Sequence, residues 1–390
     1  MKDTNRAKPD ANGLYRILIG TATSAHQVEG DNGNSDWWYF ERAGRIKHSS
    51  GSACGQYELY RKDIELMKSL KLNAYRFSIE LSRVMPKPGV IDRDALEHYT
   101  KLTDALNENG IEPIPTLWHY TLPLWMQKEG GMANKKNVRY FKEYASALFE
   151  KGLNARYLLT ANEPLLYAGS AYLFGIYPPF KRLSADFFRV LDNTTDMHNE
   201  IYDIAKSYGY EVSLTNNFMN VDRNPILFPV NKMIDYFLNK RALENAKLDF
   251  ISVNYYTDVR LRNMTQFITS RGKRRDTEND EHSLERILLE MHNRFNKPVF
   301  VTENGINTTD ENVRRKFIVE NFNEVLSAMS RGVSVIGYLY WSLIDNYEWD
   351  FGYEPKYGIF GLDRITKERI MKPSALTLRY IAENYGLQTK

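Results

Sequence analysis

The stretch LLTANEPLLY occupies Leu158–Tyr167, and it is an apolar run that stops on an asparagine, a glutamate and a proline. A second stretch of the same design, VFVTENGIN, occupies Val299–Asn307. Short runs rich in apolar and β-branched residues are typical of buried strands, and proline or glycine ends them. Two buried strands that stop on Glu163 and Glu303 therefore predict a shared chemical site at one edge of a sheet.

Similar apolar runs recur along the chain. The predicted strands are Ile17–Ser24, Ala74–Glu80, Ile111–Trp118, Arg156–Ala161, Val212–Asn217, Phe250–Tyr255, Pro298–Thr302 and Ser334–Trp341. Segments of helical period alternate with them, at Gln56–Leu70, Asp94–Asn109, Asn137–Lys151, Ala185–Tyr208, Asn231–Ala246, Ser283–Phe295, Glu311–Arg331 and Ser374–Asn384. Gly152 is a fitting C-cap for the third helix, and Thr309 or Asp310 a fitting N-cap for the seventh.

This alternation predicts parallel strands joined by helical crossovers, with both sheet faces covered. A doubly wound open sheet is the alternative, but Gly20–Gly30 (GTATSAHQVEG) is not the glycine-rich phosphate turn that such sheets usually carry after the first strand. The pattern therefore predicts an α/β fold, a (β/α)8 TIM barrel that forms a single domain over residues 1–390.

Composition argues against several classes of partner. The formal net charge is only +3, from 52 basic and 49 acidic residues, so no nucleic-acid partner is expected. The basic run Ser270–Asp276 (SRGKRRD) is interpreted as a solvated loop. Cys54 is the only cysteine, the first residues (MKDTNRAKPDANG) lack an apolar signal segment, and no apolar run is long enough to span a bilayer. We therefore expect a cytoplasmic protein without a membrane partner; the sequence does not indicate its oligomeric state.

In such a barrel the active site lies at the C-terminal ends of the strands. The residues predicted there are His26, Gln27, Arg76, Trp118, His119, Asn162, Glu163, Asn216, Asn217, Asn254, Tyr255, Tyr256, Glu303, Asn304 and Trp341, with Glu348 and Trp349 in the loop beyond. Amides, imidazole and carboxylates bind vicinal hydroxyls, and aromatic faces cover the C–H face of a sugar ring. Zinc is the alternative, but the histidines lack the HExxH spacing and there is no cysteine set, so neither a metal nor a cofactor is expected.

The two glutamates belong to the fourth and seventh predicted strands, which face each other across a barrel. A lone glutamate at a strand end more often caps a loop or forms a salt bridge. Two carboxyls flanking a sugar-shaped cavity are the catalytic groups of most glycosidases.

These motifs resemble glycoside hydrolase family 1, the family of retaining β-glucosidases and β-galactosidases. The matching segments, in family order, are GTATSAHQVEG (Gly20–Gly30), NAYRFSIE (Asn73–Glu80), TLWHYTLPLW (Thr116–Trp125), TANEP (Thr160–Pro164), NYYT (Asn254–Thr257), TENG (Thr302–Gly305) and YWSLIDNYEWDFGY (Tyr340–Tyr353). They cover nearly the whole chain, which is short for the family. The resemblance implies a small-molecule β-glycoside or oligosaccharide as substrate.

The resemblance also implies a role for each matching residue. Glu163 would be the general acid/base and Glu303 the nucleophile, with Arg76 and Tyr256 keeping Glu303 ionised and aimed. The residues implied for sugar binding are Gln27, His119, Asn162, Asn216, Asn254, Trp341, Glu348, Trp349 and Tyr357. Asn216 is the weaker assignment, because Asn217 is an equal candidate for the matching position.

The sequence departs from the family pattern in three places. Leu81 stands where a tryptophan is common, Cys54–Tyr60 (CGQYELY) replaces an Asp-His-Tyr-type run, and the loops after the fifth and sixth strands are shortened. These departures bear on which leaving group the protein prefers, and not on the chemistry of the reaction. Alternatives to a β-glucosidase with β-galactosidase or β-fucosidase side activities are a transglycosylase, a catalytically weak sugar-binding barrel, and a 6-phospho-β-glycosidase, whose phosphate Glu348 would repel. The sequence does not indicate which sugar is preferred.

Overall fold

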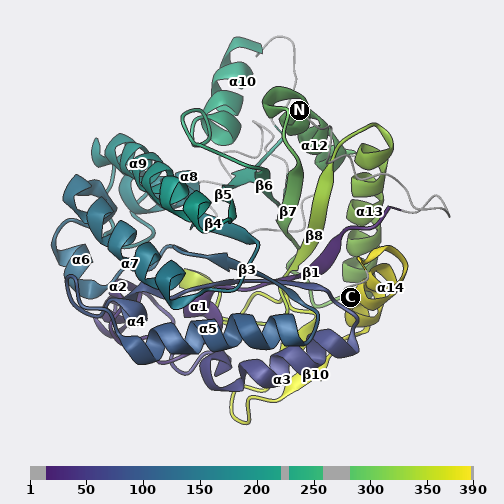
Figure 1. The fold of residues 1–390 in the computed structure, drawn as a ribbon, viewed down its shortest axis with the longest axis horizontal. Coiled ribbons are helices and arrows are strands. Elements are labelled where there is room, and N and C mark those ends of the chain that lie inside the picture. The colour runs from purple at the N-terminus through teal and green to yellow at the C-terminus, as the bar shows by residue number, and fades with distance from the viewer. Residues whose placement is uncertain (1–14, 221–227, 258–281, 388–390) are drawn as a thin grey trace.

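Eight parallel strands close into a barrel in the computed structural model, which describes residues 15–220, 228–257 and 282–387 (Figure 1). The strands are β1 (Leu18–Ala22), β2 (Ala74–Ser78), β3 (Glu112–Thr116), β4 (Tyr157–Asn162), β5 (Glu211–Phe218), β6 (Ile251–Tyr255), β7 (Val299–Asn304) and β8 (Val335–Trp341). Each overlaps a predicted strand. Leu18 of β1 pairs with Gly337 of β8, so the sheet has no free edge, and the predicted (β/α)8 fold is confirmed.

Helices surround the barrel (Figure 1). The long ones are α3 (Gln56–Ser69), α5 (Arg93–Glu108), α7 (Val138–Lys151), α9 (Asp186–Ser207), α12 (Ser283–Phe295), α13 (Glu311–Ser330) and α14 (Pro373–Tyr385). Their ends follow the predicted caps: Gly152 ends α7 with a left-handed φ of 93°, and the Asp310 carboxylate accepts from the first backbone N–H groups of α13.

The predicted helix Asn231–Ala246 is confirmed only in its first part. The chain forms α10 (Phe228–Asp235), which continues into a π-helical turn, η5 (Tyr236–Lys240). Side chains compete with the regular ladder at this point: Asn239 exchanges two hydrogen bonds with the backbone of Met219, and Asn216 of β5 donates to the Leu238 carbonyl. These contacts hold η5 against the end of β5.

Several elements lie in segments for which no helix or strand was predicted. They are α1 (Ala25–Val28), α2 (Asp36–Arg42), α4 (Leu81–Val84), α6 (Leu124–Lys128), α8 (Pro164–Ala168), the π-helical turn η3 (Gly169–Leu173), and the hairpin of β9 (Phe360–Leu362) and β10 (Arg369–Met371). They are too short to show a helical or strand period in the sequence. Leu81, the departure from the family pattern, is buried in the core at the start of α4.

The barrel interior has an apolar layer and a polar layer. The apolar layer consists of Leu18, Ala74, Ile114, Tyr157, Leu159, Phe250, Phe300 and Leu339. Towards the C-terminal ends of the strands the pairing becomes irregular in β4, β6 and β7, next to Asn162, Asn254 and Asn304. Such irregularities turn side chains away from a regular alternation, and here they coincide with the polar strand ends.

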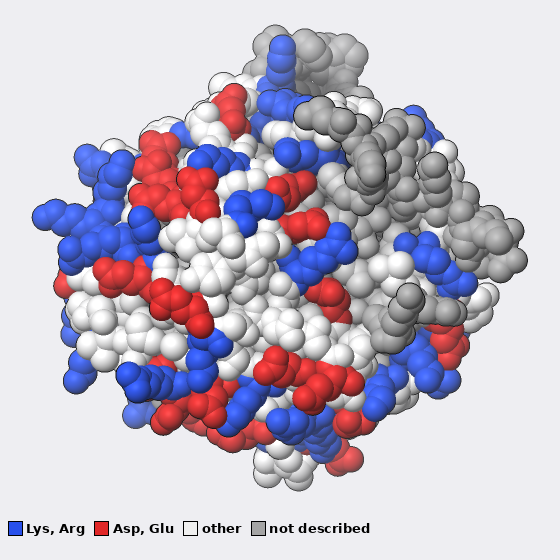
Figure 2. Space-filling model, in the orientation of Figure 1, with Lys and Arg blue, Asp and Glu red and all other residues white. Residues whose placement is uncertain are grey.

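Acidic and basic side chains alternate on the face of the molecule in Figure 2, with uncharged residues between them. This mixture agrees with the small net charge. None of the described helices has the length and apolar character needed to cross a membrane. The basic run Ser270–Asp276 and the polar first residues lie outside the described part of the chain, as do parts of the loops after β5 and β6 that were predicted to be short.

Candidate active site

Glu163 and Glu303 both lie at the polar end of the barrel. Glu303 is the fifth residue of β7, and Glu163 directly follows β4, where its backbone adopts a left-handed conformation with φ of 44° and ψ of 59°. Pro164 begins α8 immediately afterwards, so the chain turns sharply at Glu163. A non-glycine residue in this conformation is strained, and such strain is common where a side chain is held for function. Each glutamate is only 4% exposed.

The carboxylate of Glu303 receives a donor on each oxygen. Arg76, which is fully buried on β2, donates to Oε1 at 2.5 Å, and the Tyr256 hydroxyl donates to Oε2 at 2.5 Å. The Arg76 guanidinium also donates to the Asn162 side-chain oxygen at 2.6 Å. Three strands, β2, β4 and β7, and the residue after β6 thus contribute to one contact set, and Glu303 is the glutamate that has a cation beside it.

Glu163 is held by neutral donors. The Asn254 amide donates to Oε1 at 2.8 Å, and the Tyr120 hydroxyl donates to Oε2 at 2.5 Å. The other end of the Asn254 amide accepts from Arg76 at 3.3 Å, so Asn254 and Arg76 connect the two glutamates. Burial and the adjacent carboxyl of Glu163 raise the pKa of the Tyr120 phenol well above its ordinary value, so its O–H stays a donor.

Tyr120 was not predicted as a site residue. It follows His119 in the segment Thr116–Trp125 and has a left-handed φ of 74°, which turns the chain after β3. Its position beside a predicted site histidine was the only signal in the sequence. The contact with Glu163 depends on a backbone conformation that the sequence does not reveal.

The protonation of the pair follows from burial and from the neighbouring charges. Burial raises the pKa of Glu303, and the nearby Glu163 carboxyl raises it further, while Arg76 and the Tyr256 hydrogen bond lower it. The predicted contacts of Arg76 and Tyr256 with Glu303 are present, but burial outweighs them. Two ionised carboxylates are therefore disfavoured in this site.

The imidazole of His119, which lines the cavity, is neutral. Burial and the positive charge of Arg76 hold the pKa of His119 well below its ordinary value. Since the Asn162 oxygen accepts from Arg76, the Asn162 nitrogen faces Nε2 of His119, at 3.1 Å. A neutral ring that accepts at Nε2 carries its proton on Nδ1. Nδ1 is buried and has no hydrogen-bond partner among the described residues, so it is available to a hydroxyl of a ligand.

Gln27 and Glu348 form a second polar group on the cavity wall. The Gln27 amide nitrogen donates to Glu348 at 3.0 Å and to the Tyr347 carbonyl at 2.8 Å. Two indoles flank His119 nearly in parallel, Trp341 at 6.2 Å and Trp349 at 6.1 Å between ring centroids. Hydrogen-bonding groups and aromatic faces are thus combined as sugar recognition requires.

Asn216 and Asn217 differ in what they do. Asn216 uses its amide nitrogen on the Leu238 carbonyl at 3.0 Å, which fixes η5 to β5. The Asn217 side chain is buried, and neither its oxygen nor its nitrogen has a partner within the described residues. Both residues line the cavity. The free amide of Asn217 makes it the stronger candidate for contact with a ligand.

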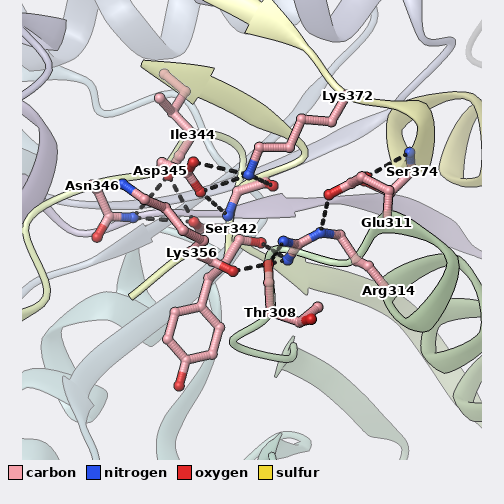
Figure 3. A network of polar contacts seen from close by, with 12 residues as sticks. Thr308, Glu311, Arg314, Ser342, Ile344, Asp345, Asn346, Lys356, Lys372 and Ser374 are labelled. Atoms are coloured by element: carbon pink, nitrogen blue, oxygen red, sulfur yellow. Dashed lines mark hydrogen bonds and ion pairs between the residues drawn. The ribbon is translucent and has the colours of Figure 1, made fainter. Parts of the chain in front are cut away.

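A network around Arg314 holds the loops that carry the site (Figure 3). Arg314, buried on α13, donates to the backbone carbonyls of Ile306 and Thr308 after β7 and of Lys356 and Tyr357 after β8. Glu311 pairs with the same guanidinium at 2.8 Å. One arginine therefore ties the segment after Glu303 to the segment that presents Tyr357. The TENG motif has a related reason for its glycine: a Cβ on Gly305 would lie 2.0 Å from the Trp341 carbonyl oxygen.

One cavity of about 790 Å3 brings most of the predicted site together. Its wall includes Gln27, His119, Asn162, Glu163, Asn216, Tyr256, Glu303, Trp341, Glu348, Trp349 and Tyr357. Arg76 and Asn254 are not part of the wall but contact the glutamates from within the barrel. No cluster of three or more His, Cys, Asp or Glu side chains suited to a metal ion occurs in the described ranges.

Comparison with known proteins identifies the family. The model of Glycosyl hydrolase family 1 matches residues 15–235 and 236–387. The chain belongs to glycoside hydrolase family 1. It is therefore a glycoside hydrolase that acts on small-molecule glycosides, and the family prediction made from its motifs is confirmed.

Two relatives of this family 1 enzyme and one solved structure match it along more than nine-tenths of their length. Beta-glucosidase A of Thermotoga maritima is 28% identical, with 95% of this chain and 98% of the relative covered. Coniferin beta-glucosidase of Pinus contorta is 30% identical, with 94% and 91% covered. A solved β-glycosidase from Pyrococcus horikoshii superposes with a TM-score of 0.89 at 32% identity, covering 99% of this chain and 97% of that one.

Proposed function

We propose that this family 1 enzyme is a retaining β-glycosidase in which Glu303 is the nucleophile and Glu163 the general acid and base. The observation that carries the assignment is the position of the cation: Arg76 contacts Glu303, whereas the groups that donate to Glu163 are neutral. A nucleophile must be ionised when it attacks, and a cation in direct contact favours the ionised form.

The reaction would proceed in two displacements. Glu303 attacks the anomeric carbon as the glycosidic C–O bond breaks, and Glu163 gives its proton to the departing oxygen. Water then attacks the glycosyl–enzyme, losing a proton to Glu163, and the sugar leaves with its original configuration. Tyr256 and Arg76 would hold Glu303 in line, and Asn254 and Tyr120 would hold Glu163.

A terminal non-reducing β-D-glucoside is the proposed substrate, with β-galactosides and β-fucosides as secondary ones. Relatives named as β-glucosidases support glucose, and the Gln27–Glu348 pair and the donor on His119 supply groups for its hydroxyls. A phosphorylated sugar is disfavoured, because the charged residues that line the described cavity wall are all acidic. Lysine or arginine would be needed to balance a phosphate.

The test is a panel of nitrophenyl β-D-glycosides carrying glucose, galactose, fucose and 6-phosphoglucose, with the product anomer followed by NMR. We expect turnover to be fastest with the glucoside, and the β-anomer to form first. Release of the α-anomer would contradict retention. Binding of the sugars without turnover would leave a carbohydrate-binding protein in place of an enzyme.

A further inference from the structure

Tyr120 donates to Glu163 from a strained turn. Its φ of 74° is left-handed, a conformation that is unfavourable for a residue other than glycine. The backbone N–H of Thr121 donates to the His119 carbonyl at 3.0 Å, so the chain reverses tightly around Tyr120. A strained residue keeps its conformation only where the surrounding structure holds it. The contacts of Thr121 and Leu122, the two residues that follow Tyr120, show which groups hold this turn.

Thr121 is fixed through its side chain and through its carbonyl group. Its hydroxyl donates to the carboxyl group of Glu80, at 2.8 Å from Oε2 and 3.1 Å from Oε1. The indole N–H of Trp118 donates to the Thr121 carbonyl at 3.1 Å. Thr121 and Glu80 are both buried, so water does not compete for the bond between their side chains.

Glu80 is itself held in a fixed position between β2 and α4. Its carboxyl group accepts from the backbone N–H of Ser82 at 3.2 Å and caps the N-terminus of α4. Its own backbone N–H donates to the hydroxyl of Tyr99 on α5 at 3.1 Å. Glu80 does not belong to the cavity wall. It can therefore influence the reaction only through the residues that it holds.

Leu122 is anchored separately, by the first residue of α2. The Leu122 backbone N–H donates to Oδ1 of Asp36 at 3.0 Å, and the Asp36 backbone N–H donates to the Leu122 carbonyl at 2.8 Å. Asp36 is fully buried. The chain that carries Tyr120 is thus held at β3 and again at Leu122, and the contact of Thr121 with Glu80 lies between these two points.

We propose that Glu80 is a positioning residue for Tyr120. The side chain of Glu80 fixes Thr121 and, with it, the turn after β3. From this turn the Tyr120 hydroxyl reaches Oε2 of Glu163, at 2.5 Å. The inference rests on the proposed function, because it takes Glu163 as the group that protonates the leaving oxygen. A carboxyl group that moves out of line with that oxygen transfers its proton less well.

The experiment compares two substrates that differ in their need for acid. A methyl glycoside needs a proton on its leaving oxygen, whereas a 2,4-dinitrophenyl glycoside of the same sugar does not. Thr121→Val removes the hydroxyl and keeps the branched shape of the side chain. We expect kcat/KM to fall about three- to tenfold for the methyl glycoside and less than about twofold for the dinitrophenyl glycoside.

The ratio of the two kcat/KM values is the readout that separates positioning from general damage. Both substrates carry the same sugar, so a displaced His119 would slow them alike and leave the ratio unchanged. An unchanged ratio in Thr121→Val would overturn the proposal.

Two matched variants control for the loss of a buried hydroxyl. Thr121→Ser retains the hydroxyl that Glu80 accepts from, so it should keep the ratio of the unaltered enzyme. Thr103→Val removes a hydroxyl that is also buried but bonds to the Thr100 carbonyl within α5, at 2.8 Å, and it should keep the ratio as well. A ratio that falls as far in either control as in Thr121→Val would overturn the role of the contact with Glu80.

A double substitution tests whether the effect passes through Tyr120. In the Tyr120→Phe background the hydroxyl that reaches Glu163 is already absent, so adding Thr121→Val should lower the ratio no further. Losses that multiply in the double variant would show that Thr121 acts by another route, and they would overturn the positioning of Tyr120 by Glu80.

A crystal structure of Thr121→Val provides a readout without turnover. We expect the Tyr120 hydroxyl to have moved out of hydrogen-bond distance of Glu163; a hydroxyl that stays in place overturns the proposal whatever the reaction is. If the hydroxyl moves but Glu163→Ala slows both substrates equally, only the acid role in the proposed function fails, and the positioning of Tyr120 by Glu80 stands.

Discussion

Replacing Tyr256 with phenylalanine removes one hydroxyl from Glu303 and leaves the aromatic ring in place. That hydroxyl lies 2.5 Å from Oε2 of Glu303, and its hydrogen bond lowers the pKa of the carboxyl against the upward effect of burial. Arg76 stays on the other oxygen, so the site keeps its ion pair. The substitution therefore isolates one contribution to the charge of the proposed nucleophile.

The magnitude follows from the strength of that bond. A hydrogen bond to a charged group contributes about 1.5–3 kcal/mol, and about 1.4 kcal/mol corresponds to a tenfold change in an acid dissociation constant. The donor favours the ionised carboxylate, so its loss raises the pKa of Glu303. The acid limb of the kcat/KM profile should move up by about one to two on the pH scale. At a fixed pH on that limb, kcat/KM should therefore fall about ten- to hundredfold.

The measurement is kcat/KM for a nitrophenyl β-glycoside between pH 4 and pH 8. Tyr75→Phe is a suitable control, because Tyr75 on β2 is also a buried tyrosine but bonds to Thr23 and Gln56 and to neither glutamate. The control should keep the acid limb of the unaltered enzyme. An acid limb in Tyr256→Phe that stays in place, or moves to lower pH, would refute the assignment of Glu303 as the group that must be ionised.

Other substitutions separate the remaining roles. Glu303→Ala should abolish turnover, and added formate should restore part of it by attacking in place of the carboxylate. A variant that keeps normal turnover and is not rescued by formate would contradict a nucleophilic role. Glu163→Ala should slow alkyl glycosides far more than activated aryl glycosides, which need little acid assistance, and equal losses in kcat/KM would remove the acid assignment. Tyr120→Phe should show the same selectivity with a smaller loss, which a comparison of the two substrates measures. Arg314→Leu should lower the free energy of unfolding by about 2–4 kcal/mol, since it strands several backbone carbonyls and Glu311, and an unchanged Tm would contradict this.

The strand ends were predictable because their signals are local. An apolar run that stops on a polar residue predicts both the strand and the side chain at its end. Glu163 and Glu303 could therefore be assigned to the same end of the barrel. The pairing register of the strands did not have to be known, because a closed parallel barrel brings the C-terminal ends of all its strands together. The family resemblance added the role of Arg76 beside Glu303, which its position part-way along β2 does not by itself indicate.

The features that escaped prediction depend on contacts between distant segments. Tyr120 reaches Glu163 only because its backbone takes a left-handed turn. The π-helical turn η5 replaces a regular helix because Asn216 and Asn239 bind across to backbone groups. Helical periodicity reports which residues of one segment are buried. It carries no information on side chains that form hydrogen bonds with the backbone of a distant segment.

The charge balance of the barrel interior explains why the site suits a two-carboxylate reaction. The contact set around Arg76 holds this one cation and two carboxyls, Glu303 in direct contact and Glu163 through Asn254, while His119 stays neutral. Buried net charge is penalised, so the interior is closest to neutral when the two carboxyls share one proton. That is also the state that double displacement requires, with one carboxyl able to give a proton and the other charged. Arg76 breaks the symmetry, because it contacts Glu303 directly and reaches Glu163 only through Asn254. The condition that makes the buried layer stable is thus the condition that prepares it for catalysis.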